Sequence, residues 1–143
     1  MRQQARGQIH ERITAIPNAW YPIYLVRGEK SNLVIDAGVN LLGPRYCEVI
    51  RETLGEDQPL HYLFLTHSHY DHIGAAGYLK EHFSGLKIGA HERLASLMQK
   101  PSVLGLMNGL SANHVELHKY NPAGEDLTLR PFDIDIALKQ GDR

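Results

Sequence analysis

The sequence predicts an α/β layered fold in a single domain, residues 1–143. Short apolar runs of strand length alternate with amphipathic helical segments, a pattern typical of a sheet covered by helices. The first predicted strands follow one another without an intervening helix, which favours antiparallel hairpins over a doubly wound parallel sheet. Hydrophobic residues make up 43% of the chain and charged residues 22%, which is enough apolar material for an ordinary globular core.

Three strands are predicted near the N-terminus. Residues 9–17 alternate apolar with polar side chains, and residues 20–26 are rich in aromatic and β-branched residues. A polar turn, RGEKSN, then leads to a short buried strand over residues 33–36. Pro22 lacks the N–H group that a sheet ladder needs, so we expect its strand to lie at an edge or to carry a bulge.

Helices and strands then alternate as far as Pro101. Residues 43–55 form the clearest predicted helix, because Pro44 suits its first turn, Gly55 suits its C-terminal cap and apolar side chains recur at helical spacing. The same periodicities predict a buried strand over 61–67, a helix over 71–83, a strand over 86–91 and a helix over 92–100. The small residues within the second helix, GAAG, either allow close packing or are plain filler.

The C-terminal third is less regular. Residues 102–127 mix apolar patches with Gly, Asn and Pro, which predicts either a helical pair or a mobile flap. The Leu and Met content of this segment would suit a lid over an apolar substrate, and an inserted helical pair without substrate contact is the alternative. Residues 127–143 predict a strand, a turn, a second strand and a final turn.

The composition excludes several classes of protein. A net charge near −1 with scattered Lys and Arg predicts neither a nucleic-acid partner nor an anionic membrane. The single cysteine, Cys47, gives neither a disulfide framework nor a Cys₄ zinc site, and we expect it to pack inside its helix. Residues 1–20 lack the apolar core of a signal peptide, and no window reaches the ~18 apolar residues of a membrane span, so we expect a cytoplasmic protein.

Three histidines and an aspartate crowd together where the strand over 61–67 ends, in the sequence THSHYDH. His67 and His69 would point to one side if the strand continued through them, and a strand-to-helix corner would bring Asp71 and His72 beside them. Neutral imidazoles and a carboxylate suit Zn²⁺ or a similar divalent cation. Two histidines on one ion and Asp71 with His72 on a second would form half of a two-metal site, in which Asp71 could also orient a water or act as general base.

The stretch THSHYDHIGAAGYL resembles the His-x-His-x-Asp-His motif of the metallo-β-lactamase superfamily. NLVIDAG, residues 32–38, is similar to the family's strand that ends in Asp-x-Gly, and LKQGDR resembles its later Gly-Asp turn. The resemblance runs from about Ile13 to the C-terminus. It implies an αββα sandwich with metals at the rim between its two sheets, of which this chain matches the N-terminal half.

The resemblance also implies roles for single residues. His67 and His69 would bind the first metal, Asp71 and His72 would bind the second, and Asp36 would orient a ligand from behind it. The other interpretation of Asp36 is a turn-forming residue before a glycine. The implied cofactor is Zn²⁺, two ions per complete site, with iron or manganese as alternatives.

The family pattern continues with further metal ligands that this sequence does not contain. His114 and His118, four residues apart, could pair as ligands on a helix, but they precede the LKQGD segment instead of following it. His91 is expected to be a surface residue near a helix N-terminus. We therefore expect a fragment, a truncated product, or a chain that forms a homo-oligomer or needs a partner to complete the sandwich, because a half-sandwich would expose apolar sheet surface.

The function implied by the resemblance is that of a metal-dependent hydrolase. A metal-bound hydroxide would attack a small-molecule thioester, lactone, β-lactam or similar ester or amide bond, or a phosphoester. A mononuclear-iron persulfide dioxygenase of the same superfamily is one alternative, and metal identity would distinguish it. The other alternative is a truncated non-catalytic chain that binds metal or serves in assembly.

Overall fold

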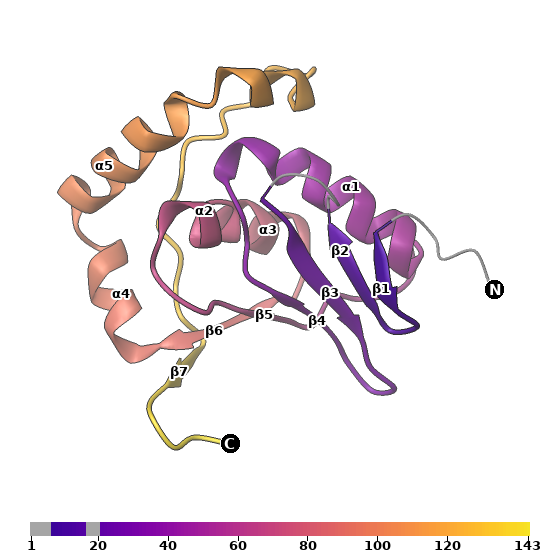
Figure 1. Cartoon of the computed structure of the whole chain (residues 1–143). Helices are drawn as coiled ribbons and strands as arrows, with labels where there is room; N and C mark the ends of the chain where they lie inside the picture. The colour runs from indigo at the N-terminus through magenta and orange to yellow at the C-terminus, as the bar shows by residue number, and fades with distance from the viewer. Residues whose placement is uncertain (1–6, 17–20) are drawn as a thin grey trace.

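One mixed β-sheet organises the molecule (Figure 1). The computed structural model describes residues 7–16 and 21–143. In these ranges the sheet has seven strands, whose order in space is their order in the chain: β1 (Gln8–His10), β2 (Ile13–Ile16), β3 (Ile23–Arg27), β4 (Asn32–Ile35), β5 (Tyr62–Phe64), β6 (Lys87–His91) and β7 (Ile136–Leu138). Strands β1 to β4 pair antiparallel, and β4 to β7 pair parallel. An N-terminal meander is thus joined to a parallel half.

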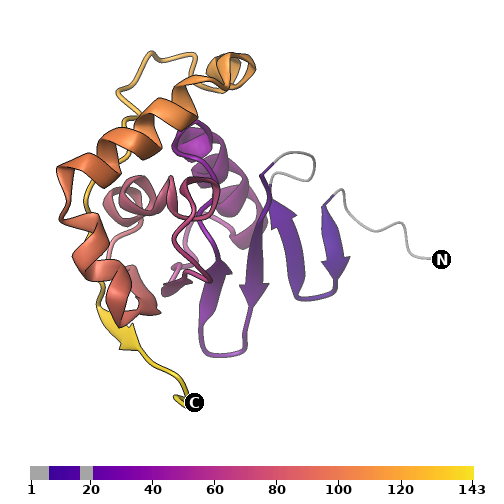
Figure 2. The same cartoon turned by 60° about the vertical axis from the view of Figure 1, so that its left-hand side comes forward.

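Helices cover one face of this sheet. The helical segments are η1 (Asn40–Leu42), α1 (Gly43–Leu54), α2 (Tyr70–Ile73), α3 (Ala76–His82), α4 (Glu92–Met98), α5 (Pro101–Ala112) and η2 (Val115–Tyr120). In Figure 1, α1, α2 and α3 lie across the same face, and Figure 2 shows α4 and α5 continuing around the β6 side, where α5 contacts α2. Within the described part of the chain, no helix is long and apolar enough to cross a membrane.

The two faces of the sheet differ in burial. Leu25, Val34 and Leu63 point toward the helices and are fully buried. The strand register places Tyr24, Ile35 and Phe64 in one row on the opposite face, where Tyr24 is 37% exposed. No helix covers this second face in the described ranges (Figure 1). One helical layer and one sheet are therefore present, which is half of the four-layer sandwich that the sequence predicted.

Several predicted elements are confirmed. The helix expected over 43–55 is α1, with Pro44 in its first turn and Gly55 as its C-terminal cap. The strand over 86–91 and the helix over 92–100 correspond to β6 and α4. Cys47 is buried in α1 as expected, and burial raises the pKa of its thiol to about 12, so the thiol stays protonated.

The N-terminal strands differ from the prediction. The single strand expected over 9–17 is two strands, β1 and β2, which pair antiparallel after a tight turn; Pro17 and Trp20, at the ends of predicted strands, lie outside the described residues. The expectation for Pro22 is wrong, since β3 lies between β2 and β4 and pairs with both without a bulge. Pro22 precedes the first ladder residue, so its missing N–H group costs the sheet nothing.

The helix predicted over 71–83 is two helices. The N–H groups of Gly74 and Ala75 donate to the carbonyl oxygens of Gly38 and Ala37, at 2.8 and 3.2 Å. These bonds replace the contacts to residues four positions earlier that a continuous helix would use. The chain therefore breaks between α2 and α3, and α2 is fixed to the loop that follows β4.

The C-terminal segment is helical first and extended later. Residues 102–127 contain most of α5 and all of η2. Of the two predictions for this segment, the helical pair is therefore confirmed. The strand expected at 127–130 is absent. Leu127 and Leu129 are buried in alternation, but their backbone groups bond to the side chains of Asn40 and Asn108 instead of to a strand. The alternating apolar pattern of this segment therefore reflects packing against the helices and not a strand in the sheet.

Candidate metal centre

The candidate centre lies where β4 and β5 end side by side. These strands are parallel neighbours, so the residues that follow them meet at the same edge of the sheet. The N–H group of Asp36 donates to the carbonyl oxygen of Phe64, at 2.8 Å, which extends the pairing by one residue. Asp36 thereby comes next to Thr66 at the start of the histidine motif.

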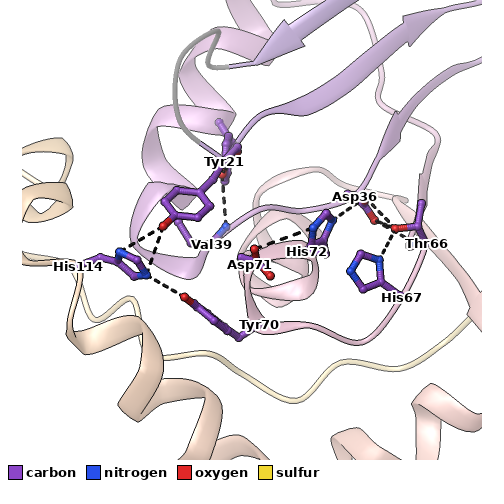
Figure 3. Close-up of polar contacts among 10 residues, drawn as sticks. Tyr21, Asp36, Val39, Thr66, His67, Tyr70, Asp71, His72 and His114 are labelled. Carbon is purple, nitrogen blue, oxygen red and sulfur yellow. Dashed lines mark hydrogen bonds and ion pairs between the residues drawn. The ribbon is translucent and has the colours of Figure 1, made fainter.

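Asp36 accepts hydrogen bonds from three groups of the motif (Figure 3). Its carboxylate accepts from the backbone N–H of Thr66 at 2.8 Å and from the Thr66 hydroxyl at 2.9 Å. The Nδ1 atom of His72 lies 2.9 Å from the other carboxylate oxygen. Asp36 is buried and has a φ angle of 64°, a left-handed conformation that Asp tolerates better than most residues. It is therefore both a turn residue and a partner of the motif.

These contacts fix which ring nitrogen of two histidines is free. His72 donates its Nδ1–H to Asp36, which leaves the lone pair of Nε2 available. The single hydroxyl hydrogen of Thr66 goes to Asp36, so the Thr66 oxygen accepts from Nδ1 of His67, 2.8 Å away. His67 is therefore also left with a free Nε2. One buried carboxylate thus orders two imidazoles.

The four motif side chains lie close together in pairs, though not by the predicted route. Strand β5 ends at Phe64, so His67 and His69 lie in the loop beyond it and strand alternation does not align them. Their ring centroids are nevertheless 4.6 Å apart, and those of His67 and His72 are 4.0 Å apart. The Asp71 carboxylate lies 4.0 Å from Nε2 of His72. The turn into α2 brings His72 to His67, whereas Asp71 is in contact with His72 alone among the motif side chains.

The types of side chain in the motif are those that bind divalent metal ions. Imidazole nitrogens with free lone pairs and a carboxylate are zinc ligands, and a carboxylate behind a ligating histidine is the usual support for such a ligand. Among the described residues, however, no three or more His, Cys, Asp or Glu side chains are arranged so that they could hold a metal ion. Metal binding would thus require the side chains to adjust or further ligands to join them.

Small residues allow the close approach that positions α2. A Cβ atom on Gly74 would lie 2.5 Å from the backbone nitrogen of Asn40 and 2.8 Å from the carbonyl oxygen of Gly38. A Cβ atom on Gly38, whose φ is 54°, would overlap the Tyr46 hydroxyl. At these two positions the small residues are needed for packing, so the close-packing interpretation of the GAAG segment holds for Gly74.

The structure adds His114 and Tyr21 to the surroundings of the motif. The sequence had raised His114 only as a ligand paired with His118, and it had not raised Tyr21. The Tyr70 hydroxyl lies 2.9 Å from Nε2 of His114, and the Tyr21 hydroxyl lies 3.3 Å from its Nδ1 (Figure 3). Burial, and then the neighbouring Tyr70, Asp71 and Glu116, raise the pKa of Tyr21. Neither the spacing of His114 from His118 nor the tyrosine inside the motif identifies this contact in the sequence.

His118 and His91 have no contact with the motif among the hydrogen bonds of the described residues. His118 lies exposed within η2 and His114 precedes that helix, so the two do not pair as ligands on one helix. His91 is exposed and caps α4 by accepting from the N–H of Arg93, in agreement with the expectation of a surface residue.

Comparison with known proteins decides the family. A family model described as the metallo-beta-lactamase superfamily matches residues 22–140. The chain belongs to the metallo-β-lactamase superfamily. Members of this superfamily are mostly metal-dependent hydrolases.

Its similarity to individual superfamily members is partial. Hydroxyacylglutathione hydrolase GloC of Haemophilus influenzae is 36% identical over 113 residues, covering 76% of this chain and 50% of that protein. Exodeoxyribonuclease WalJ of Streptococcus pneumoniae is 24% identical over 111 residues, covering 78% of this chain and 40% of the relative. The solved structure of BJP-1, a subclass B3 metallo-β-lactamase of Bradyrhizobium japonicum, matches with a TM-score of 0.67 at 20% identity, over 95% of this chain and 46% of that one. The chain thus spans about half the length of these superfamily members, and the structural match supports the fold alone.

Proposed function

We propose that the protein is a metal-dependent hydrolase in which the histidine motif and Asp36 supply one part of a two-zinc site. The observation that carries the proposal is the Asp36 carboxylate, 2.9 Å from Nδ1 of His72 and bonded to Thr66. It leaves His67 and His72 each with a free Nε2, the atom a metal would need. If His67 and His72 served only to stabilise the fold, there would be no need for both rings to have Nε2 free.

The motif residues divide between two ions in this proposal. His67 and His69 would hold one zinc ion, and Asp71 and His72 would hold the second. Bound zinc would supply a water of lowered pKa and would polarise a carbonyl group. Asp71 is partly exposed beside His72, so its carboxylate can also accept a proton from a water molecule at the site.

A small acyl compound is the proposed substrate, with a thioester or lactone bond. The similarity to GloC, whose name specifies a hydroxyacylglutathione, supports a thioester. The near-neutral net charge gives little attraction for a polyanion such as DNA. Leu106 and Leu110 on α5 are 66% and 41% exposed, and this helix, which contacts α2, could shield an apolar acyl group.

Metal content tests the proposal first. The full chain is purified without added metal or chelator, and its metals are measured by plasma mass spectrometry together with the intact mass. We expect zinc in the wild type, approaching two ions per chain if the ligand set is completed. His72→Ala should lose zinc, whereas the control His118→Ala, at an exposed histidine of η2, should retain it.

A zinc-loaded sample is then assayed with a hydroxyacylglutathione thioester and with a simple lactone. Hydrolysis of either one that disappears in His72→Ala and persists in His118→Ala supports the proposal. Iron at one ion per chain would point to oxygenase chemistry instead. Absence of bound metal, or equal zinc in the two variants, would contradict the metal-dependent hydrolase.

A further inference from the structure

Three side chains from separate segments meet beside Asp71, on the side away from Asp36 (Figure 3). Tyr21 precedes β3, Tyr70 begins α2 and His114 precedes η2. The Tyr70 hydroxyl lies 2.9 Å from Nε2 of His114. The Tyr21 hydroxyl lies 3.3 Å from Nδ1 and 3.4 Å from Nε2 of the same ring, which it meets edge-on at 71°. We call Tyr21, Tyr70 and His114 the tyrosine–histidine cluster.

The cluster contains more hydrogens than it can use. A neutral imidazole carries one N–H hydrogen and one free lone pair, and the two phenols bring two further hydrogens. Each of the two contacts within the cluster uses one hydrogen. One of the three hydrogens is therefore left over, whichever ring nitrogen of His114 is protonated.

The geometry assigns the leftover hydrogen to Tyr21. A carboxylate can only accept, and that of Glu116 lies 3.5 Å from Nδ1 of His114, so the ring hydrogen is assigned to Nδ1 and Nε2 accepts from the Tyr70 hydroxyl, 2.9 Å away. The Tyr21 oxygen can then only accept from His114, and within the described residues its own O–H is left without an acceptor.

The backbone of Tyr21 is held in a costly conformation. Its φ angle is 49°, and Asp36 is the other non-glycine residue with a positive φ among the described residues. Such conformations are unfavourable for non-glycine residues and gather at functional sites. The Tyr46 hydroxyl donates to the carbonyl oxygen of Tyr21 at 2.6 Å and thereby fixes it.

A cavity lies next to Tyr21. It has a volume of about 120 Å³ and is bounded by Tyr21 and by Glu116, Leu117, Lys119 and Tyr120 of η2. Tyr21 therefore stands between the motif and a space that a small group of a substrate can enter. Its wall carries one positive charge, on Lys119, and one negative charge, on Glu116.

We propose that the free O–H of Tyr21 donates a hydrogen bond to a carbonyl or carboxylate oxygen of the bound substrate, and that His114 holds Tyr21 in place for it. Tyr21 is the substrate-contacting residue and His114 is a positioning residue. The inference rests on the proposed function, since it names how an acyl substrate is recognised at that site. It also places the η2 residues that line the cavity, Glu116, Leu117, Lys119 and Tyr120, next to the bound substrate.

The test uses Tyr21→Phe, which removes only the hydroxyl oxygen, with Tyr24→Phe on the uncovered sheet face as the matched control. Sodium lactate serves as the probe, titrated onto the zinc-loaded full chain and followed by NMR of tyrosine labelled with ¹³C at Cζ. We expect the Tyr21 signal of the wild type to shift, and affinity for lactate to fall about tenfold in Tyr21→Phe, as for loss of a hydrogen bond to a charged group. Tyr24→Phe should bind lactate like the wild type, and zinc affinity should be equal in all three proteins.

His114 is tested by its conservative variant. His114→Gln keeps a donor and an acceptor, so it should retain more lactate binding than His114→Ala at equal zinc content. With a hydroxyacylglutathione thioester, Tyr21→Phe should lower kcat/KM by about tenfold to a hundredfold without loss of zinc. A purely structural role would instead lower the melting temperature and leave the binding constant of the folded fraction unchanged.

Failure of the inference and failure of the proposed function give different results. Unchanged lactate affinity in Tyr21→Phe, with normal zinc uptake, overturns the inference and leaves the hydrolase standing. If the wild type takes up no zinc, the proposed function fails and the titration of the metal-free chain decides the inference. A shift of the Tyr21 signal on addition of lactate to the metal-free chain supports the proposed hydrogen bond from Tyr21. A titration without such a shift overturns it.

Discussion

The Asp36 carboxylate lies 2.9 Å from Nδ1 of His72, although 36 positions separate the two residues in the sequence. The parallel pairing of β4 with β5 brings them together, because it places the loop after β4 beside the histidine motif. Asp36 reaches this position with a left-handed backbone, which few residues other than Gly, Asn and Asp adopt at low cost. Its identity is therefore constrained by the backbone and by the imidazole at once.

Replacing Asp36 by Asn separates these two constraints. Asn tolerates the same φ angle and keeps one oxygen for Thr66, but its NH₂ group would face Nδ1 of His72 and force the ring hydrogen onto Nε2. We expect zinc affinity to fall about 10- to 100-fold, as for other residues that support a ligand from behind. Competition with a chromogenic zinc chelator measures the change.

The control for this experiment is the folded state of the variant. The melting temperature of Asp36→Asn should stay close to that of the wild type, whereas Asp36→Ala should lower it, because Ala also loses the Thr66 bonds. Equal zinc affinity in Asp36→Asn and the wild type would show that the carboxylate does not support a metal ligand.

Gly74 provides a second test, of the packing beneath α2. The methyl group of Ala would lie 2.5 Å from the backbone nitrogen of Asn40 and 2.7 Å from the carbonyl oxygen of Tyr70, and backbone cannot move aside as a flexible side chain can. We expect Gly74→Ala to destabilise the protein by about 1–3 kcal/mol or more. Urea unfolding followed by circular dichroism gives the free energy.

The matched control is Gly105→Ala, since Gly105 lies in α5 with nothing within 4 Å of an added Cβ. Ala there should be neutral or should stabilise the helix by up to about 1 kcal/mol. If both variants unfolded at the same urea concentration, the close contact between α2 and the loop after β4 would be unimportant for stability.

Asp135 predicts a pH-dependent contribution to stability. Burial alone would raise the pKa of its carboxyl, but hydrogen bonds from Lys80 and from the N–H of Ile88 outweigh it, and the pKa is lowered. A carboxyl with a lowered folded-state pKa stabilises the protein above its unfolded value, about pH 4, and loses this effect as the pH falls through the folded value. Asp135→Asn should therefore be less stable than the wild type at pH 7, and the difference should close below about pH 4.

Urea unfolding of both proteins across this pH range measures the difference. Asp133→Asn, at an exposed aspartate two residues earlier, is the control and should follow the wild type at every pH. A difference between Asp135→Asn and the wild type that stays constant with pH would mean that the carboxyl contributes through packing and not through its charge.

The uncovered sheet face predicts association. Tyr24, Ile35 and Phe64 lie in one row there, and apolar patches of this kind mark contact surfaces. We expect the chain at micromolar concentration to exceed the mass of one copy in sizing with light scattering, and Tyr24→Glu to reduce this mass. Leu106→Glu, on exposed α5, should not. A monodisperse monomer in the wild type would contradict the prediction.

The features that local sequence determines were predicted well. Pro44 marks the start of helix α1 and Gly55 marks its end, and β6 is an apolar run between turns. The bounds of these two elements can therefore be predicted without knowledge of distant contacts. The motif and Asp36 were found because each has its own short pattern. The motif and Asp36 lie together because β4 and β5 are adjacent strands. Only the family resemblance predicted that Asp36 would lie near the motif.

The features that were missed depend on pairs of residues far apart in the sequence. The break between α2 and α3 arises from the bond between Gly74 and Gly38, and the absence of a strand at 127–130 from the bond between Leu129 and Asn108. The position of His114 depends on how α5 returns over α2. No local sequence pattern specifies the distant polar group to which Gly74, Leu129 or His114 forms a hydrogen bond.

The strand order of the sheet, which repeats the order of the chain, has a consequence for how the protein folds. The hairpins of β1 to β4 close over short turns, whereas pairing β4 with β5 must first close the long segment 36–61. Loop-closure entropy makes such distant pairings the slower ones. Asp36 and His72 can meet only after that closure. We therefore expect a refolding chain to regain its strand signal before its capacity for zinc, a delay that stopped-flow mixing with a fluorescent zinc indicator would reveal.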